Sequence, residues 1–213
     1  MGNLPHPLSL NVKQLKEMLN GDVQILDARA PEAFAGGHIR GSIPIARSMI
    51  PVFAGWVLNV EKPIVIIDDH SPHLEEVVRH LIRIGFDNIS GYLAGGFINW
   101  YVAAQQMEKF NLWSVRELNE HLNGEDIFLL DVRDVDSFEE GHIKDAHNIY
   151  AGKVHERIAE IPKDKHVVVY CDSGVKTSMV ASILKREGYQ QITNVLGGFI
   201  AWQKSGYDVV TQS

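Results

Sequence analysis

The chain has 213 residues, of which 45% are hydrophobic and 22% charged, and its formal net charge is −7. This composition is typical of a soluble globular protein, and the acidic balance without a basic stripe argues against nucleic acid as a partner. No apolar stretch approaches the roughly 20 residues that span a bilayer, so no membrane partner is expected.

The chain contains one cysteine, Cys171, which cannot form an internal disulfide. A single free thiol fits a reducing compartment, and the first residues lack the basic flank and apolar core of a signal peptide. We therefore expect a cytoplasmic protein. Its length suggests one large domain or two domains of about a hundred residues each.

The sequence repeats itself in two halves. Each half opens with a helix that starts at a capping residue, Asn11 or Ser114, followed three positions later by Gln or Glu. This spacing predicts a capping box. We expect the two helices to end near Gly21 and Gly124, with glycine at the C-cap.

Later segments continue the repeat. A buried strand ending in Asp-x-Arg comes next in each half, and a Phe-x-x-Gly-His-Ile segment follows it. The expected elements are strands at 23–29, 63–68, 127–133 and 166–171, helices at 74–84 and 178–187 that close on Gly85 and Gly188, and Gly-Gly-Phe-x-x-Trp segments at 95–100 and 197–202.

This alternation of strands and helices predicts an α/β fold with parallel sheets and right-handed crossovers. The boundary between the halves falls near residues 108–112. We expect two tandem domains, 1–109 and 110–213, each a central parallel sheet flanked by helices.

The stretch 167–178 carries the most chemical information. A β-branched strand ends at Cys171, a small polar loop with Gly174 follows, and an apolar helix then begins. Backbone N–H groups of such a loop and of the first helical turn can converge on one point. These dipoles and the charge of Lys176 predict a Cys171 pKa below that of a free thiol. The alternative is a buried structural cysteine.

The first half has no thiol at the matching place. Aligning Gly85 with Gly188 puts Asp68 opposite Cys171, and Ser71 stands where the second half has Gly174. The first half is therefore interpreted as a degenerate copy of the second.

The loop after Asp68 contains further metal-ligating residue types. Asp68 and Asp69, together with His70 and His73, could in principle bind a metal. A solvated loop is the stronger interpretation because no further ligands are evident, and we expect no metal site.

Arg133 lies just past a strand end, where ligands bind in open α/β sheets. It is either a second cation at the mouth of the site or the ion-pair partner of Asp131, Asp134 or Glu139. The sequence favours neither interpretation of Arg133 over the other.

Other polar and aromatic residues have more than one interpretation. Thr177 and Ser178, at the helix start, either donate hydroxyl hydrogen bonds or cap the helix. Residues that occur in both halves, although only one half has a thiol, are expected to be structural. They are the pairs His38 and His142, and Trp100 and Trp202.

Together, the Asp-x-Arg, Phe-x-x-Gly-His-Ile, Cys171-loop and Gly-Gly-Phe-x-x-Trp segments resemble the rhodanese family of sulfurtransferases, twice over nearly the whole chain. The resemblance implies that Cys171 takes a sulfane sulfur from a small anionic donor, becomes a persulfide, and passes the sulfur to a thiol or cyanide. No cofactor is implied. Family loops commonly carry Arg where this chain has Lys176, which cannot bind an oxyanion bidentately.

In this reaction the amides of the loop should hold the terminal persulfide sulfur and an incoming anionic oxygen. The loop residues expected to line the site are Asp172, Ser173, Gly174, Val175, Lys176 and Thr177.

Residues 53–58, before Lys62, are similar to the degenerate rhodanese half of fusions with a persulfide dioxygenase. This second resemblance implies a low-molecular-weight persulfide as donor. It also implies a dioxygenase-like partner or a fused domain outside this sequence.

Two other function classes stay open. One is a non-catalytic sulfur carrier that docks on a partner enzyme. The other is a Cys-loop phosphatase or arsenate reductase, whose loop is one residue longer, with Arg six positions after Cys. Here Lys176 is five positions after Cys171, so the loop is too tight for a tetrahedral phosphate.

Overall fold

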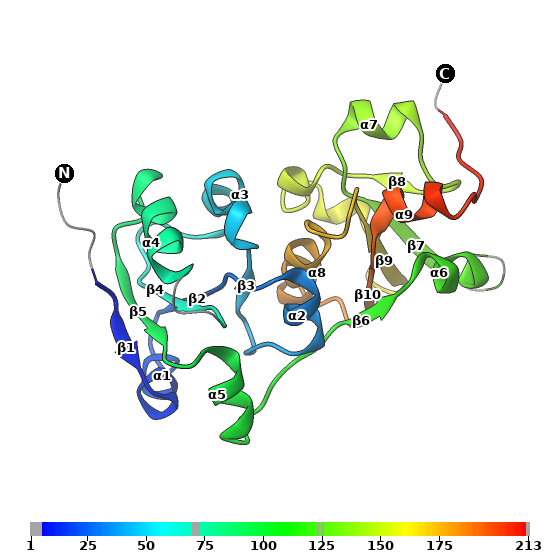
Figure 1. The fold of residues 1–213 in the computed structure, drawn as a ribbon. Helices are drawn as coiled ribbons and strands as arrows, with labels where there is room; N and C mark the ends of the chain where they lie inside the picture. Colours follow the sequence, from blue (N-terminus) through cyan, green and yellow to red (C-terminus); the bar gives the residue numbers. More distant parts are fainter. Residues whose placement is uncertain (1–5, 70–72, 123, 125, 212–213) are drawn as a thin grey trace. The chain divides into compact units, whose positions relative to one another are not determined.

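The structure is a computed structural model that describes residues 6–69, 73–122, 124 and 126–211. The chain divides into two compact units, Met1–Lys109 and Phe110–Ser213 (Figure 1). Each unit is an α/β domain built on one five-stranded parallel sheet, as the sequence predicts.

In the first unit the strand order is β1-β5-β4-β2-β3. Its elements are β1 (Leu8–Leu10), α1 (Val12–Met18), β2 (Gln24–Asp27), α2 (Pro31–Gly36), β3 (Ile43–Pro44), α3 (Ile50–Val57), β4 (Ile64–Ile67), α4 (Leu74–Arg83), β5 (Ile89–Leu93) and α5 (Gly96–Val102).

The second unit repeats this topology with strand order β6-β10-β9-β7-β8. Its elements are β6 (Asn111–Trp113), α6 (Val115–His121), β7 (Ile127–Asp131), α7 (Val135–Glu140), β8 (His147–Asn148), β9 (His166–Tyr170), α8 (Thr177–Arg186), β10 (Ile192–Val195) and α9 (Gly198–Lys204).

Helices cover both faces of the second sheet. On one face, Leu118 of α6 and Trp202 of α9 pack with Leu129, Val168 and Val195 in one buried cluster. On the other face, α8 contacts β9 and β10 (Figure 1). Burial on both faces explains why the central strands are continuous apolar runs rather than alternating ones.

The predicted capping boxes are confirmed. The Asn11 side chain accepts from the Gln14 N–H at 3.0 Å, and Ser114 Oγ accepts from the Glu117 N–H at 3.2 Å. Each box satisfies two helix-start donors that would otherwise lack a partner.

The predicted glycine C-caps of these two helices are wrong. Helices α1 and α6 end at Met18 and His121, and neither Gly21 nor Gly124 has a positive φ. In α1 the last carbonyls accept hydrogen bonds from N–H groups only three residues later, such as the bond from Gly21 N–H to Met18 O at 3.0 Å. A left-handed residue is therefore not needed.

The other predicted helix ends are confirmed. Gly85 and Gly188 have φ of +87° and +92° and directly follow the C-cap residues of α4 and α8, Ile84 and Glu187. The aromatic residue after each glycine donates its backbone N–H to a carbonyl in the last turns of the helix. In α8 this bond runs from Tyr189 N–H to Leu184 O at 3.1 Å. This is the pattern of a Schellman motif.

Candidate active site

Cys171 lies directly after β9, at the carboxyl end of a central strand. Its side chain is only 1% exposed, and the four residues before it are fully buried. The loop 172–176 then leads into α8, and the Gly174 N–H donates to Cys171 Sγ at 3.1 Å. The predicted strand, loop and helix around the thiol are therefore present.

Burial raises the pKa of the Cys171 thiol above its ordinary value. The backbone N–H groups of Lys176, Gly174 and Ser173 and the Lys176 charge act in the opposite direction, but burial outweighs them. The sequence-based expectation of a lowered thiol pKa is thus wrong. The donors converge on the sulfur as expected, yet the loop also removes it from water, and desolvation disfavours a thiolate.

Gly174 provides the backbone conformation that this loop requires. Its φ is +98°, in the region that L side chains rarely adopt. The Gly174 carbonyl also accepts a hydrogen bond from Thr177 Oγ1 at 2.7 Å. The Thr177 hydroxyl therefore braces the loop, while Ser178 Oγ accepts from Asn194 Nδ2 at 3.2 Å.

The start of α9 holds the other side of the loop. The Phe199 N–H donates to Cys171 O at 2.8 Å, and the Ile200 N–H donates to Asp172 O at 3.0 Å. A Cβ on Gly198 would lie 2.2 Å from Cys171 O, so only glycine allows this approach. This role was not predicted from the sequence, although the Gly-Gly pair that recurs in both halves was the available signal.

Arg133 is an ion-pair partner, not a free cation at the mouth. Its guanidinium binds Asp131 through Nε at 3.0 Å and Nη2 at 2.7 Å, and it lies 3.9 Å from the centre of the Phe199 ring. Arg29 binds Asp27 in the same way in the unit without a thiol. This repetition favours the structural interpretation of Arg133.

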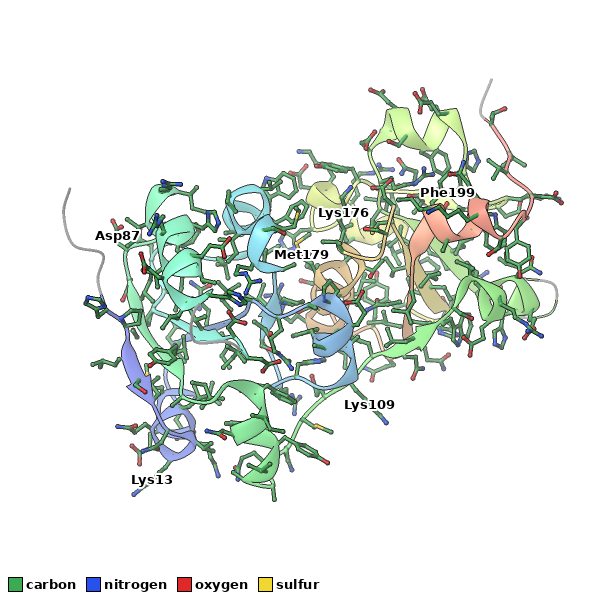
Figure 2. The ribbon with its side chains drawn as sticks, viewed as in Figure 1. Lys13, Asp87, Lys109, Lys176, Met179 and Phe199 are labelled. Atoms are coloured by element: carbon green, nitrogen blue, oxygen red, sulfur yellow. The ribbon has the colours of Figure 1, made fainter. Side chains whose placement is uncertain are left out.

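Lys176 is the cation of the loop that follows the thiol, and its charge acts to lower the Cys171 pKa. Its Nζ lies 3.2 Å from Asp172 Oδ2 and 5.9 Å from the centre of the Tyr150 ring. Figure 2 shows Lys176 where α8 begins. Sequence analysis missed Tyr150, because nothing local to it indicates a contact with the loop.

Neither of the two remaining loop residues is buried. Ser173 is exposed and Val175 is half-buried. The part of Ser173 that faces the thiol is its backbone N–H, which acts to lower the Cys171 pKa.

In the first unit, Asp68 occupies the place of Cys171. A Cβ on Gly96 would lie 2.7 Å from Asp68 O, just as one on Gly198 approaches Cys171 O. The Asp68 side chain is 8% exposed, and its Oδ2 lies 3.6 Å from Arg47 Nη1. The register inferred from the sequence therefore agrees with the structure.

Within the described ranges, no three His, Cys, Asp or Glu side chains are grouped so that they could hold a metal ion. Asp69 Oδ1 accepts from the Phe97 N–H at 3.2 Å. His70 and Ser71, which the sequence placed in this loop, lie outside the described residues.

The repeated histidines and tryptophans have the structural roles expected of them. Nδ1 of His38 and of His142 lies 2.9 Å from the carbonyl of the phenylalanine on which each ring stacks. Trp100 and Trp202 are buried, and each Nε1 donates to a carbonyl six residues later.

Among the described residues, no helix has the length and apolar character needed to cross a membrane.

Comparison with known proteins gives two matches to one family. A family model described as a rhodanese-like domain matches residues 11–103 and 114–205. A protein named sulfurtransferase from Allochromatium vinosum is 37% identical over 86 residues, which cover 40% of this chain and 80% of that protein. Thiosulfate sulfurtransferase GlpE of Coxiella burnetii is 38% identical over 78 residues, which cover 37% of this chain and 73% of that protein.

Two further similarities extend over more of the chain. The putative sulfur carrier protein YrkF of Bacillus subtilis is 25% identical over 127 residues, which cover 60% of this chain and 62% of that protein. The crystal structure of a thiosulfate sulfurtransferase from Pseudomonas aeruginosa covers 96% of this chain and 44% of its own chain, at 17% identity and a TM-score of 0.45.

Proposed function

This chain belongs to the rhodanese-like family, and from that premise we propose that it is a sulfurtransferase working through a persulfide on Cys171. The donor is thiosulfate or a low-molecular-weight persulfide, and the acceptor is cyanide or a thiol. The observation that carries the proposal is the thiol itself: Cys171 Sγ ends a central parallel strand, 3.1 Å from the Gly174 N–H.

The first half-reaction transfers one sulfur atom to the enzyme. The Cys171 sulfur attacks the outer sulfur of the donor, a new S–S bond forms, and the S–S bond of the donor breaks. The electron pair of that bond leaves with the remainder of the donor, as sulfite from thiosulfate or as a thiolate from a persulfide. The thiol proton of Cys171 is released in the same step or passes to the departing thiolate.

The second half-reaction returns the enzyme to its starting state. Cyanide or a thiolate attacks the terminal sulfur, and the S–S bond on Cys171 breaks with its electron pair on Cys171 Sγ. No net oxidation or reduction beyond the sulfur transfer takes place, so no redox cofactor is required.

The loop suits the persulfide better than the thiol. Backbone N–H groups of Ser173, Gly174 and Lys176 act on the Cys171 sulfur, but burial keeps the thiol protonated. A persulfide is more acidic than a thiol and is anionic at neutral pH, and its charged sulfur is one bond farther out. We propose that the amides stabilise that sulfur as they would an oxyanion.

A sulfur carrier is the second candidate. The similarity to the putative sulfur carrier YrkF favours it, as does the deep burial of Cys171, which is 1% exposed. In that function the protein would accept sulfur and release it only to a bound partner enzyme, such as a persulfide dioxygenase-like protein.

Steady-state turnover separates the two candidates. The purified chain is assayed with thiosulfate or glutathione persulfide as donor and cyanide or a thiol as acceptor, and Cys171→Ser serves as the control. A sulfurtransferase turns over many times, and the control is inactive. A single turnover without further product would support the carrier, and hydrolysis of an aryl phosphate lost in Cys171→Ser would support the phosphatase.

A further inference from the structure

A pocket of about 510 Å³ lies in the first unit, at the carboxyl edge of its sheet. Three of its lining residues, Arg29, Asp69 and Phe97, come shortly after the ends of β2, β4 and β5. This edge of an open α/β sheet is where ligands bind, and the volume falls in the range of roughly 300–1,000 Å³ that small-molecule sites occupy. Because this unit has no thiol, the pocket has no part in sulfur transfer through a cysteine of its own.

The buried side chains that line the pocket carry no net charge. The Arg29 guanidinium lies 4.3 Å from the centre of the Phe97 ring, and both residues are less than a tenth exposed. Arg29 Nη2 is 2.7 Å from Asp27 Oδ2, and that carboxylate is fully buried. The positive charge of Arg29 is therefore already balanced beneath the pocket.

The outer walls are large apolar side chains that remain open to solvent. Ile98, Tyr101 and Met107 line the pocket, and they are 55%, 56% and 43% exposed. Aligning the two Gly-Gly-Phe-x-x-Trp segments places Gln203 opposite Tyr101, so the second unit has an amide where the first has an aromatic ring. Exposed apolar side chains that gather around a hollow are typical of a binding site.

One carboxylate at this pocket lacks a counter-charge. Asp69 is exposed, and its Oδ1 accepts from the Phe97 N–H at 3.2 Å. Its counterpart in the second unit, Asp172, pairs with Lys176 at 3.2 Å, whereas the first unit has His73 at the place of Lys176. Over the part of the chain that the structure describes, Asp69 has no ion-pair partner.

We propose that this pocket binds a small organic cation with an aromatic or aliphatic body. The body contacts Ile98, Tyr101 and Met107, and the cationic group meets the Asp69 carboxylate. The faces of the Phe97 and Tyr101 rings attract a cation as well. A neutral ligand of the same shape lacks the ion pair, and an anionic one is repelled by Asp69. This inference goes beyond sulfur transfer and does not depend on the proposed function.

Three probes with the same ring and different charge test the proposal. Phenethylamine, phenethyl alcohol and hydrocinnamate carry an ammonium, a hydroxyl and a carboxylate. Each is titrated into the full chain, and methyl NMR signals of Ile98 and Met107 give both the affinity and the place of binding. The amine should bind about two- to fivefold more tightly than the alcohol, which is the effect of an exposed ion pair, and the carboxylate should bind most weakly. Added salt should reduce these differences.

Matched variants separate the contributions of charge and shape. Asp69→Asn keeps an acceptor oxygen for the Phe97 N–H and removes the charge, so it should abolish the preference for the amine and leave the alcohol unchanged. Asp87→Asn changes the net charge equally at an exposed residue before β5, on the opposite edge of the sheet, and should leave all three affinities unchanged. Tyr101→Gln, which installs the residue of the second unit, should weaken all three probes by about two- to tenfold.

Several results would overturn the proposal. They are equal affinities for the three probes, equal effects of Asp69→Asn and Asp87→Asn, NMR shifts only at methyl groups away from Ile98 and Met107, and no binding of any probe at millimolar concentration. Cys171→Ser should bind the amine as tightly as the wild type does. A failure of the sulfurtransferase proposal would therefore leave this site unaffected, and the reverse also holds.

Discussion

Two opposing effects act on the pKa of Cys171. Burial raises its pKa, whereas three backbone N–H groups and the Lys176 charge lower it, and burial prevails. Burial therefore favours the protonated thiol over the thiolate in the folded chain.

The rate of alkylation should report this directly. Because Cys171 is the only cysteine, the pH dependence of iodoacetamide modification measures its pKa without interference. We expect a midpoint above the roughly 8.5 of a free thiol, with reactivity rising as pH increases through it. A midpoint below that value would show that the amides outweigh burial. Cys171→Ser should show no modification.

Arg133 illustrates how a residue near a site can be structural. Burial acts to lower the pKa of Arg133, but the hydrogen bonds that its guanidinium donates to Asp131, together with the charge of that carboxylate, raise the pKa overall. Replacing Arg133 by Met leaves the buried Asp131 carboxylate without its partner, which typically costs about 3–5 kcal/mol.

We expect Arg133→Met to lower the free energy of unfolding by about 3–5 kcal/mol in urea denaturation. The matched Arg29→Met should do the same in the unit without a thiol, because Arg29 binds Asp27 with the same atoms. An unchanged unfolding free energy together with a raised KM for the donor would instead make Arg133 a substrate-binding cation.

At the scale of an element, the loop between β9 and α8 depends on a single left-handed residue. Gly174→Ala introduces strain of about 1–2 kcal/mol, since φ there is +98°. Gly188, at the other end of α8, has φ of +92° and open space around it. Gly188→Ala therefore introduces the same backbone strain far along the helix from the thiol.

Both glycine variants should lose about 1–2 kcal/mol of unfolding free energy, but only Gly174→Ala should slow sulfur addition to Cys171. The reason is that the Gly174 N–H contacts Cys171 Sγ at 3.1 Å. Thermal unfolding and single-turnover mass measurements check the two effects. Equal slowing in both variants would mean that stability alone controls the reaction.

The helices and strands that could be predicted are those whose signals are local. Capping boxes, buried strand runs and the helix ends at Gly85 and Gly188 depend on neighbouring residues. The strands β1 and β6 were missed because three residues are too few to show a period, and each is held by pairing with a strand more than eighty residues away.

The candidate site was predicted less completely than the fold. The thiol, Gly174 and the loop amides lie in one continuous stretch of sequence. The burial and the charge pairing of the site instead depend on contacts that form only when the chain folds. The burial of Cys171, the choice of Asp131 as the partner of Arg133, and the contact of Tyr150 with Lys176 all arise that way.

At the scale of the whole molecule, the two units repeat one topology but carry different residues at the place of the thiol. Both sheets have the same strand order, and Asp68 lies where the second unit has Cys171. The side chain of Asp68 is almost buried and faces Arg47. The first unit therefore has the same strand order as the second, with a carboxylate in place of the thiol.

Restoring the nucleophile should not restore activity. We expect the double variant Asp68→Cys with Cys171→Ser to show no thiosulfate:cyanide activity. Asp69 places a carboxylate next to the new thiol, which disfavours a thiolate, and Ser71 replaces the glycine of the loop. Activity near that of the wild type would show that the first loop is intact.

The central claim is that Cys171 carries sulfur as a covalent intermediate. Its most direct test is the intact mass of the protein after incubation with thiosulfate or a persulfide and removal of the donor. The account predicts a gain of one sulfur atom on the peptide containing Cys171, lost again on adding cyanide or a thiol, and absent in Cys171→Ser. An unchanged mass with every donor, or a sulfur located on another residue, would contradict it.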